Sequence, residues 1–449
     1  MKNKVDLLNG PIDSSLRVFT FPLAISFVIH MLYAWVDTFY VSRLGSTSIA
    51  AIGISEQLIF FIFTLGGGFS IGSGIVVARR IGEGNQEKAD RTATQAISLM
   101  FIYSSALAVF LFFMTEPVLS AMNVEGELAE LSSQYLYAVV LGVPGNYLVF
   151  QINAIVRSSG NSIFPMIMLI TGTVLNAILS PLLVFGLGPF PRLEIYGAGL
   201  ATAIAQSITA VISLIALRKG ITPITITFHK FRFNLQVIKT IVRISIPTSL
   251  QFLSVSVNRL LLFTMANVFG TTVVAAYTLG LKVDLFVFMS IFATGAAIEI
   301  ISGQNMGARQ FERIFLYHKS AIKQLSILMM VLALLVFFGG KYFSMIFTTN
   351  PDIIDETVTY FRIIAFSYIP FAVGIISTRV ISGAGDTKRS LKIVATILLL
   401  IQLPMAYLLS MYTGLDQTGI WISILFSQVL FAVFGLIALF RKKWMFVKL

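Results

Sequence analysis

The sequence predicts an all-α integral membrane protein with twelve transmembrane helices in two six-helix lobes. Hydrophobic residues make up 57% of the 449 positions and charged residues only 12%, whereas an ordinary soluble domain carries about a quarter charged residues. Long apolar windows recur along the whole chain, and the two halves resemble each other. These three observations together define the fold class.

Each apolar window holds about 20 or more residues, enough to cross a hydrocarbon core roughly 30 Å thick at about 1.5 Å per residue. A β-barrel would need short alternating segments instead of such runs. The first window is too long for the apolar part of a cleaved signal peptide, so we expect it to remain in the protein. The predicted helices cover residues 16–41, 49–77, 92–114, 132–155, 163–187, 195–217, 240–266, 273–301, 316–338, 357–378, 390–412 and 419–440.

A shift of 225 residues aligns landmarks of the first half with landmarks of the second. The aligned pairs are Pro22 with Pro247, Gly45 with Gly270, Gly82 with Gly307, and Gly160 with Gly385. Six helices separate the copies, an even number, so the repeats run parallel and are related by an axis along the membrane normal. We therefore expect an amino-terminal lobe at 1–217, a cytoplasmic linker at 218–239 and a carboxy-terminal lobe at 240–449.

The basic residues indicate the orientation of the chain. If the amino terminus is cytoplasmic, the opposite loops contain few of the 32 Lys and Arg residues, namely Arg43, Arg192 and Lys341. Cytoplasmic loops carry the excess of cations in membrane proteins, so both termini are expected in the cytoplasm. The net charge of +12 is then explained by topology and contact with anionic lipids, and nucleic acid is not expected as a partner.

Ionisable residues inside the membrane are candidates for function because a charge in hydrocarbon costs free energy. In the first helix His30, Tyr33 and Asp37 follow at i, i+3 and i+7, and this spacing places them on one face. An apolar environment and nearby cations act on a carboxyl group in opposite directions, so Asp37 can take up and release a proton. A structural hydrogen bond or ion pair at Asp37, and plain packing at His30, are the alternatives.

The second lobe has charges of its own, and the shift of 225 places Leu262 opposite Asp37. Lys282 and Asp284 cannot face each other at i and i+2, so each needs another partner, and Arg259 is a candidate for Asp284. A structural ion-pair network and a substrate or second ion site both remain open. Glu299 is expected at the cytoplasmic end of its helix. Aromatic faces attract cations and Met adapts to varied shapes, so Tyr147 and Met289 are candidates for a substrate cavity.

Several motifs are absent from the sequence. It contains no G-x-x-x-x-G-K-[ST], H-E-x-x-H or G-x-S-x-G, the signatures of a phosphate loop, a zinc hydrolase and a serine hydrolase. It also contains no cysteine. An enzyme is therefore not expected, nor is a cofactor, and ATP is not the expected source of energy.

Four stretches carry a family resemblance: "FPLAISFVIHMLYAWVDTFYVSRLGSTSIAAIGI", "ARRIGEGNQEKAD", "AIVRSSGNS" and "GTVLNAILSPLLVFGLG". Together with their echoes in the second half, they resemble the multidrug and toxic compound extrusion (MATE) transporters. The likeness extends over almost the whole chain. Within the family, the sequence is most similar to the prokaryotic DinF-like branch. In that branch a coupling acid lies on the first helix, at the position of Asp37.

The resemblance implies an ion-coupling site made of Asp37 with Asn153 and Asn176. A Na⁺ ion would be bound at Asp37 and Asn176. Related sequences often have a second aspartate where this chain has Ser180, and His30 stands where relatives can carry an amide. Both departures favour H⁺ over Na⁺ as the coupling ion.

The expected function is secondary active efflux of cationic or amphipathic organic compounds in exchange for H⁺, with Na⁺ as the less favoured ion. The transporter is expected to be a monomer in a prokaryotic inner membrane. A flippase for a lipid-linked saccharide is the alternative, since the cations Arg259, Lys282 and Arg362 would suit a phosphate head group. A passive channel is less favoured because no repeated selectivity filter is visible.

Overall fold

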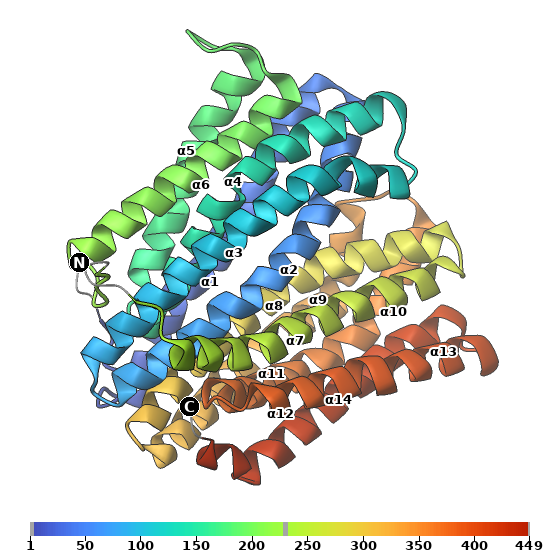
Figure 1. The fold of residues 1–449 in the computed structure, drawn as a ribbon. Coiled ribbons are helices and arrows are strands. Elements are labelled where there is room, and N and C mark those ends of the chain that lie inside the picture. Colours follow the sequence, from blue (N-terminus) through green and yellow to red (C-terminus); the bar gives the residue numbers. More distant parts are fainter. Residues whose placement is uncertain (1–3, 228–231, 448–449) are drawn as a thin grey trace. The chain divides into compact units, whose positions relative to one another are not determined.

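The computed structural model describes residues 4–227 and 232–447, and within these ranges the side chains of residues 32, 34–38 and 60–65 lie outside the description. The described residues form helices and contain no β-strand. The α-helices are α1 (Ile12–Val41), α2 (Ser46–Gly82), α3 (Gln86–Ala121), α4 (Gly126–Ser158), α5 (Ile163–Phe185), α6 (Glu194–Arg218), α7 (Leu235–Asn267), α8 (Thr271–Gly307), α9 (Phe311–Met345), α10 (Pro351–Ile364), α11 (Tyr368–Gly383), α12 (Thr387–Ala395), α13 (Leu403–Tyr412) and α14 (Asp416–Phe440) (Figure 1).

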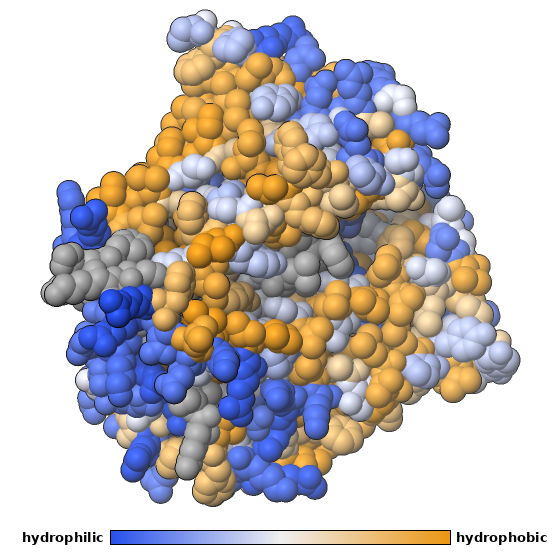
Figure 2. Space-filling model, in the orientation of Figure 1, coloured by the Kyte–Doolittle hydropathy of each residue, from blue (hydrophilic) through white to orange (hydrophobic). Residues whose placement is uncertain are grey.

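The helices have the length and composition of membrane spans. Within the described residues, eleven helical segments are long and apolar enough to cross a bilayer, with α10 and α11 forming one of them and α12 and α13 another. α2, with 37 residues, is also long enough and contains the segment 60–65. Large apolar side chains such as Phe338, which is 72% exposed, face outward, and Figure 2 shows broad hydrophobic areas over the helices. This surface matches a lipid environment, so the chain is a multi-pass membrane protein with the expected twelve-helix architecture.

Two membrane spans, Pro351–Gly383 and Thr387–Tyr412, are each divided by a short segment that is not α-helical. A short 3-10 turn, Ala365–Ser367, separates α10 from α11. A π-helical segment, Thr396–Gln402, joins α12 to α13 and ends just before Pro404. Proline has no backbone N–H and its ring clashes with the carbonyl four residues earlier, so the helix widens at this point.

The internal repeat is visible in the helix boundaries. α2 and α8 begin and end 225 positions apart, and α4 corresponds in the same way to the span from Pro351 to Gly383. Gly45 (φ 121°) and Gly270 (φ 100°) precede the equivalent helices α2 and α8. Both need positive φ, which a residue with a Cβ rarely adopts. The shared turn explains why this glycine pair recurs.

The described residues fall into two compact units. The first lies within Met1–Val5 and Phe21–Ser245, and the second within Asp6–Thr20 and Ile246–Leu449. In the first unit, α4 packs mainly against α6, α2 and α3; in the second, α11 packs against α14, α8 and α9. Residues 6–20 thus belong to the second unit, although the rest of α1 belongs to the first.

Side chains of α8 and α9 hold the segment Asp6–Thr20 in the second unit. The carbonyl oxygen of Leu7 accepts hydrogen bonds from Asn305 Nδ2 (3.2 Å) and Tyr317 Oη (3.2 Å). Arg313 donates to the carbonyl of Gly10. Leu7, Leu16 and Phe19 are buried. Polar contacts and apolar burial therefore act together to fix this segment.

Candidate ion-coupling site and buried acid

Two residues expected at the coupling site, Asn176 and Ser180, lie one turn apart on α5 and are fully buried. Asn176 Nδ2 donates a hydrogen bond to Thr202 Oγ1 of α6 over 3.0 Å. Asn176 Oδ1 has no hydrogen-bond partner among the described residues. A buried amide oxygen without a donor costs free energy, so this atom is available to a proton donor or a cation.

A second unpartnered amide oxygen lies on α4, which packs against both α5 and α6. Asn153 is 6% exposed, and within the described part of the chain its Oδ1 atom has no hydrogen-bond partner. Two residues earlier, Gln151 Nε2 donates to Ser73 Oγ of α2 over 2.6 Å. Native proteins leave few buried polar atoms unpaired. The first unit thus contains buried amides on α4 and α5 with acceptor oxygens that have no partner among the described residues.

α1 reaches the same region through residues on either side of Asp37. Tyr40 Oη donates to the carbonyl oxygen of Ala177, the neighbour of Asn176, over 3.4 Å. The ring of His30, an exposed residue, packs edge-on against Phe150 of α4 with centroids 5.9 Å apart. Tyr33 is partly buried. The side chain of Asp37 lies outside the described residues, so its role remains a prediction.

The cavity candidate Tyr147 is 2% exposed in this structure. Gly66 of α2 makes room for it, since a Cβ at Gly66 would lie 1.7 Å from Tyr147 Cε1. Its ring lies 6.1 Å from that of Tyr103 on α3. Tyr147 is therefore enclosed by α2 and α3 here, and its contact with a substrate remains a prediction.

Asp284 of α8 is 3% exposed, and hydroxyl groups satisfy its two oxygens. Tyr360 Oη donates to Oδ2 over 2.5 Å, and Tyr368 Oη donates to Oδ1 over 2.7 Å. Gly280, one turn earlier on α8, gives Tyr360 access, because a Cβ there would lie 2.3 Å from the ring. The sequence had suggested no partner on α10 or α11 for this acid.

The expected pairing of Asp284 with Arg259 is wrong for this structure. No ion pair among the described residues includes either side chain, and Arg259 is exposed on α7. Lys282 is also exposed and lies 5.7 Å from the ring of Phe347. The two tyrosines reach the carboxylate from helices packed against α8, and they remove its need for the arginine.

Met289, further along α8, is buried at 7% exposure.

Glu299 has a partner that sequence reasoning missed. It is 4% exposed, and both of its oxygens lie 3.2 Å from Arg379 Nη1 of α11. The glutamate expected at the cytoplasmic end of its helix is therefore enclosed in a buried ion pair. Arg379 is a charged residue in the apolar span Pro351–Gly383, and this could have identified it as a membrane-embedded charge. Its partner could not be predicted, because it depends on the packing of α8 against α11.

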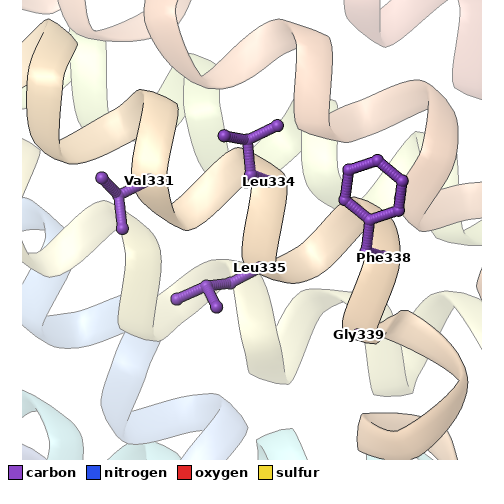
Figure 3. Close-up of a pocket in the computed structure, with 5 residues that line it drawn as sticks. All are labelled: Val331, Leu334, Leu335, Phe338 and Gly339. Carbon is purple, nitrogen blue, oxygen red and sulfur yellow. The ribbon is translucent and has the colours of Figure 1, made fainter.

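A shallow groove on α9 does not contribute to ion binding. Val331, Leu334, Leu335, Phe338 and Gly339 line it, and its volume is about 450 Å³. Figure 3 shows that all five residues come from one helix and that their side chains are hydrocarbon. A cation needs oxygen ligands, so this surface suits only apolar contacts.

The fold is a bundle of long apolar helices with an internal repeat, and it buries the acids Asp284 and Glu299 among these helices. Buried ionisable groups in membrane spans are typical of transporters. The MatE family model matches residues 22–182 and 247–408, once in each half of the chain. The protein belongs to this family of MATE transporters and is not an enzyme.

Individual relatives are distant but cover nearly the full chain. The probable multidrug resistance protein YoeA of Bacillus subtilis is 26% identical over 91% of this chain and 89% of its own. A protein named FAD transporter from Shewanella oneidensis is 26% identical over 92% of each. A solved structure of a MOP superfamily transporter from Pyrococcus furiosus has a TM-score of 0.91 and 24% identity over 98% of each chain. Family membership supports multidrug efflux as the general function, and the solved structure supports the fold.

Proposed function

We propose that the protein exports cationic or amphipathic organic compounds in exchange for H⁺, with Na⁺ as the less favoured coupling ion. The contact between α1 and α5 supports this proposal. Tyr40 reaches the carbonyl of Ala177, beside the buried Asn176 whose Oδ1 atom has no partner in the described part. Asp37 precedes Tyr40 by three positions, a separation that brings two residues to one side of a helix.

In this proposal Asp37 is the coupling acid. Protonation removes its charge and changes its hydrogen bonding with the amides of the first unit, Asn153 and Asn176. Ser180 supplies a hydroxyl without a charge, and His30 and Tyr33 assist proton transfer along α1. A change at this site can drive transport only if the proton binds one conformation more tightly than the other. The alternating conformations then differ in their affinity for the exported compound.

Substrate contacts are proposed for Tyr147 and Met289, whose aromatic and thioether groups suit flat cations, and for the polar residues Arg259, Lys282 and Asp284. The transporter would act as a monomer in a prokaryotic cell membrane with both termini in the cytoplasm. The excess of cations in the loops on that side supports this orientation.

A flavin nucleotide is a second candidate substrate, and the similarity to the FAD transporter of Shewanella oneidensis is the observation that favours it. Such a substrate is anionic, so its export would depend on cations in place of carboxylates. The exposed side chains of Arg259 and Lys282 are the candidates for that contact.

Transport into proteoliposomes tests these alternatives. Purified protein is reconstituted, a pH gradient or a Na⁺ gradient is imposed separately, and movement of ethidium or FAD is measured. We expect ethidium transport driven by the pH gradient in the wild type and none above background in Asp37→Asn. Asp355→Asn, which changes an exposed acid of α10, is the matched control and should transport normally. Full ethidium transport by Asp37→Asn would refute the assignment of the coupling acid.

A further inference from the structure

We infer that Asp284, together with Tyr360 and Tyr368, forms a second proton-binding site, located in the second unit. The inference deepens the proposed function and rests on it for its role in transport. Its ligand is H⁺, bound and released by the carboxyl group of Asp284. Asp284 is buried, has two phenolic partners and forms no ion pair with another described residue.

The surroundings of Asp284 oppose a permanent negative charge. The residue is 3% exposed and lies in the apolar span α8. None of the ion pairs between described residues involves it. Moving a carboxylate out of water without a compensating cation costs several kcal/mol even after the protein relaxes. Burial alone would therefore keep the group protonated.

The two tyrosines act in the opposite direction. Their hydroxyl groups approach Oδ2 and Oδ1 at 2.5 Å and 2.7 Å, distances typical of hydrogen bonds from O–H to a carboxylate. Hydrogen bonds to the charged form stabilise it relative to the neutral form. Burial and hydrogen bonding therefore compete at one carboxyl group, and the competition favours a group that can change its protonation state.

The same tyrosines can satisfy the neutral form as well. A phenol is both a donor and an acceptor, so a protonated Asp284 can donate to one hydroxyl oxygen while still accepting from the other tyrosine. Lys and Arg could not do this, because they only donate. Both carboxyl oxygens of Asp284 therefore keep a hydrogen-bond partner in either protonation state.

Aromatic packing holds the tyrosines in place. The ring of Trp421 on α14 lies edge-on to Tyr360 at 4.9 Å and tilted against Tyr277 at 5.0 Å. Trp421 Nε1 in turn donates to Glu356 Oε1 over 3.0 Å. The ring of Phe288 lies edge-on to Tyr368 at 5.9 Å. The hydroxyl groups thus point to the carboxyl group from fixed positions.

The charged and titratable neighbours can be assigned to the elements that pack against α8. α10 contributes Tyr360 and α11 contributes Tyr368. On α8 itself, Tyr277 interacts electrostatically with Asp284 and with Arg259 of α7. α9 also packs against α8, but in the described part of the chain no ionisable side chain of α9 is bonded to Asp284. The phenols are therefore its direct partners.

Infrared difference spectroscopy tests the inference without any substrate. The full-length protein is reconstituted in lipid and titrated from acid to alkaline pH in the Asp37→Asn background, which removes the other proposed acid. The measurement follows the carbonyl stretching band of a protonated carboxyl group. We expect a component that disappears as pH rises and that is absent when Asp284→Asn is added.

The tyrosine variants provide a second test if Asp284→Asn does not fold. Tyr360→Phe and Tyr368→Phe each remove one donor to the carboxylate, so the midpoint should move to higher pH by about one unit, equivalent to about 1.4 kcal/mol. Asp355→Asn is the control and should leave the midpoint unchanged. A band that persists in Asp284→Asn, or a midpoint unaffected by both tyrosine changes, would overturn the inference. Loss of ethidium transport with an intact Asp284 titration would instead refute only the proposed export function.

Discussion

Gly383 of α11 lies against the backbone carbonyl of Glu299 in α8, and a Cβ at position 383 would lie 2.1 Å from that oxygen. Positions 225 residues earlier are Ser158 and Gly74, where a Cβ on Gly74 would lie 2.9 Å from Ser158 Oγ. Equivalent helices thus approach closely in both units, but the glycine is on α2 in the first and on α11 in the second. The repeat therefore preserves the close approach of the two helices, but the glycine that permits it lies on a different helix in each unit.

Gly383→Ala should destabilise the second unit. The added methyl group meets backbone atoms that cannot rotate away, so α8 and α11 must separate, at a cost of about 1–3 kcal/mol. Thermal unfolding of the purified protein in detergent measures the change. Gly53→Ala is the matched control because nothing lies within 4 Å of a Cβ at that helical glycine. Equal stability of the two variants would show that the contact between α8 and α11 can accommodate a methyl group at position 383.

Arg379→Met should destabilise the protein strongly because it leaves Glu299 buried without its cation. Removing one member of a buried ion pair costs about 3–5 kcal/mol. We expect a cost near the lower limit, because the side chain of Arg379 is 19% exposed. Chemical unfolding of single and double variants measures the coupling. We expect Glu299→Gln to recover much of the loss when added to Arg379→Met. Additive losses in the double variant would argue against a shared interaction.

Asn176→Leu should separate a functional role from a structural one. It removes a buried oxygen that lacks a partner among the described residues, so we expect a free energy of unfolding within about 1 kcal/mol of the wild type. We expect pH-driven transport to fall about tenfold, because the loss of one proposed hydrogen bond to Asp37 corresponds to about 1.4 kcal/mol. Thr202→Val removes the acceptor of the hydrogen bond donated by Asn176 Nδ2 and is the control. Normal transport by Asn176→Leu would reduce Asn176 to a contact between α5 and α6.

Arg313→Gln should loosen the early segment Asp6–Thr20. Arg313 donates to the carbonyls of Leu7 and Gly10, and a shorter side chain cannot reach both. Hydrogen–deuterium exchange followed by mass spectrometry should show faster exchange in this segment, because opening requires less free energy. Lys319→Gln, which changes an exposed cation of the same helix, should leave exchange unchanged. Unaltered exchange in Arg313→Gln would mean that burial of Leu16 and Phe19 is sufficient for docking.

Much of the fold was predictable because it depends on properties of short segments. The helices α5 (Ile163–Phe185) and α13 (Leu403–Tyr412) end close to the limits of the apolar windows. Other helices are longer than their predicted windows. For example, α3 covers Gln86–Ala121, whereas the predicted window is 92–114. The first turns of α3 carry polar residues and lie outside the apolar window. Hydropathy detects only the part of a helix that lies in lipid.

The residues of the candidate sites could be predicted from the sequence, but their hydrogen-bond partners could not. Asp284 could be selected because charged groups are rare in apolar spans, and Asn153 and Asn176 followed from the family resemblance. Their partners Thr202, Tyr360 and Tyr368 are common residues of membrane helices, and nothing in their local sequence distinguishes them. The eight-residue spacing of the two tyrosines, near two helical turns, was the only available signal.

The sequence by itself determined the membrane location, the repeat of 225 residues and the identity of the buried acids, because hydropathy and internal similarity are properties of the chain alone. Tertiary structure decided that Asp284 is bound by Tyr360 and Tyr368, and that residues 6–20 join the second unit. These contacts join positions that are far apart in sequence, and helix packing brings them within hydrogen-bonding distance.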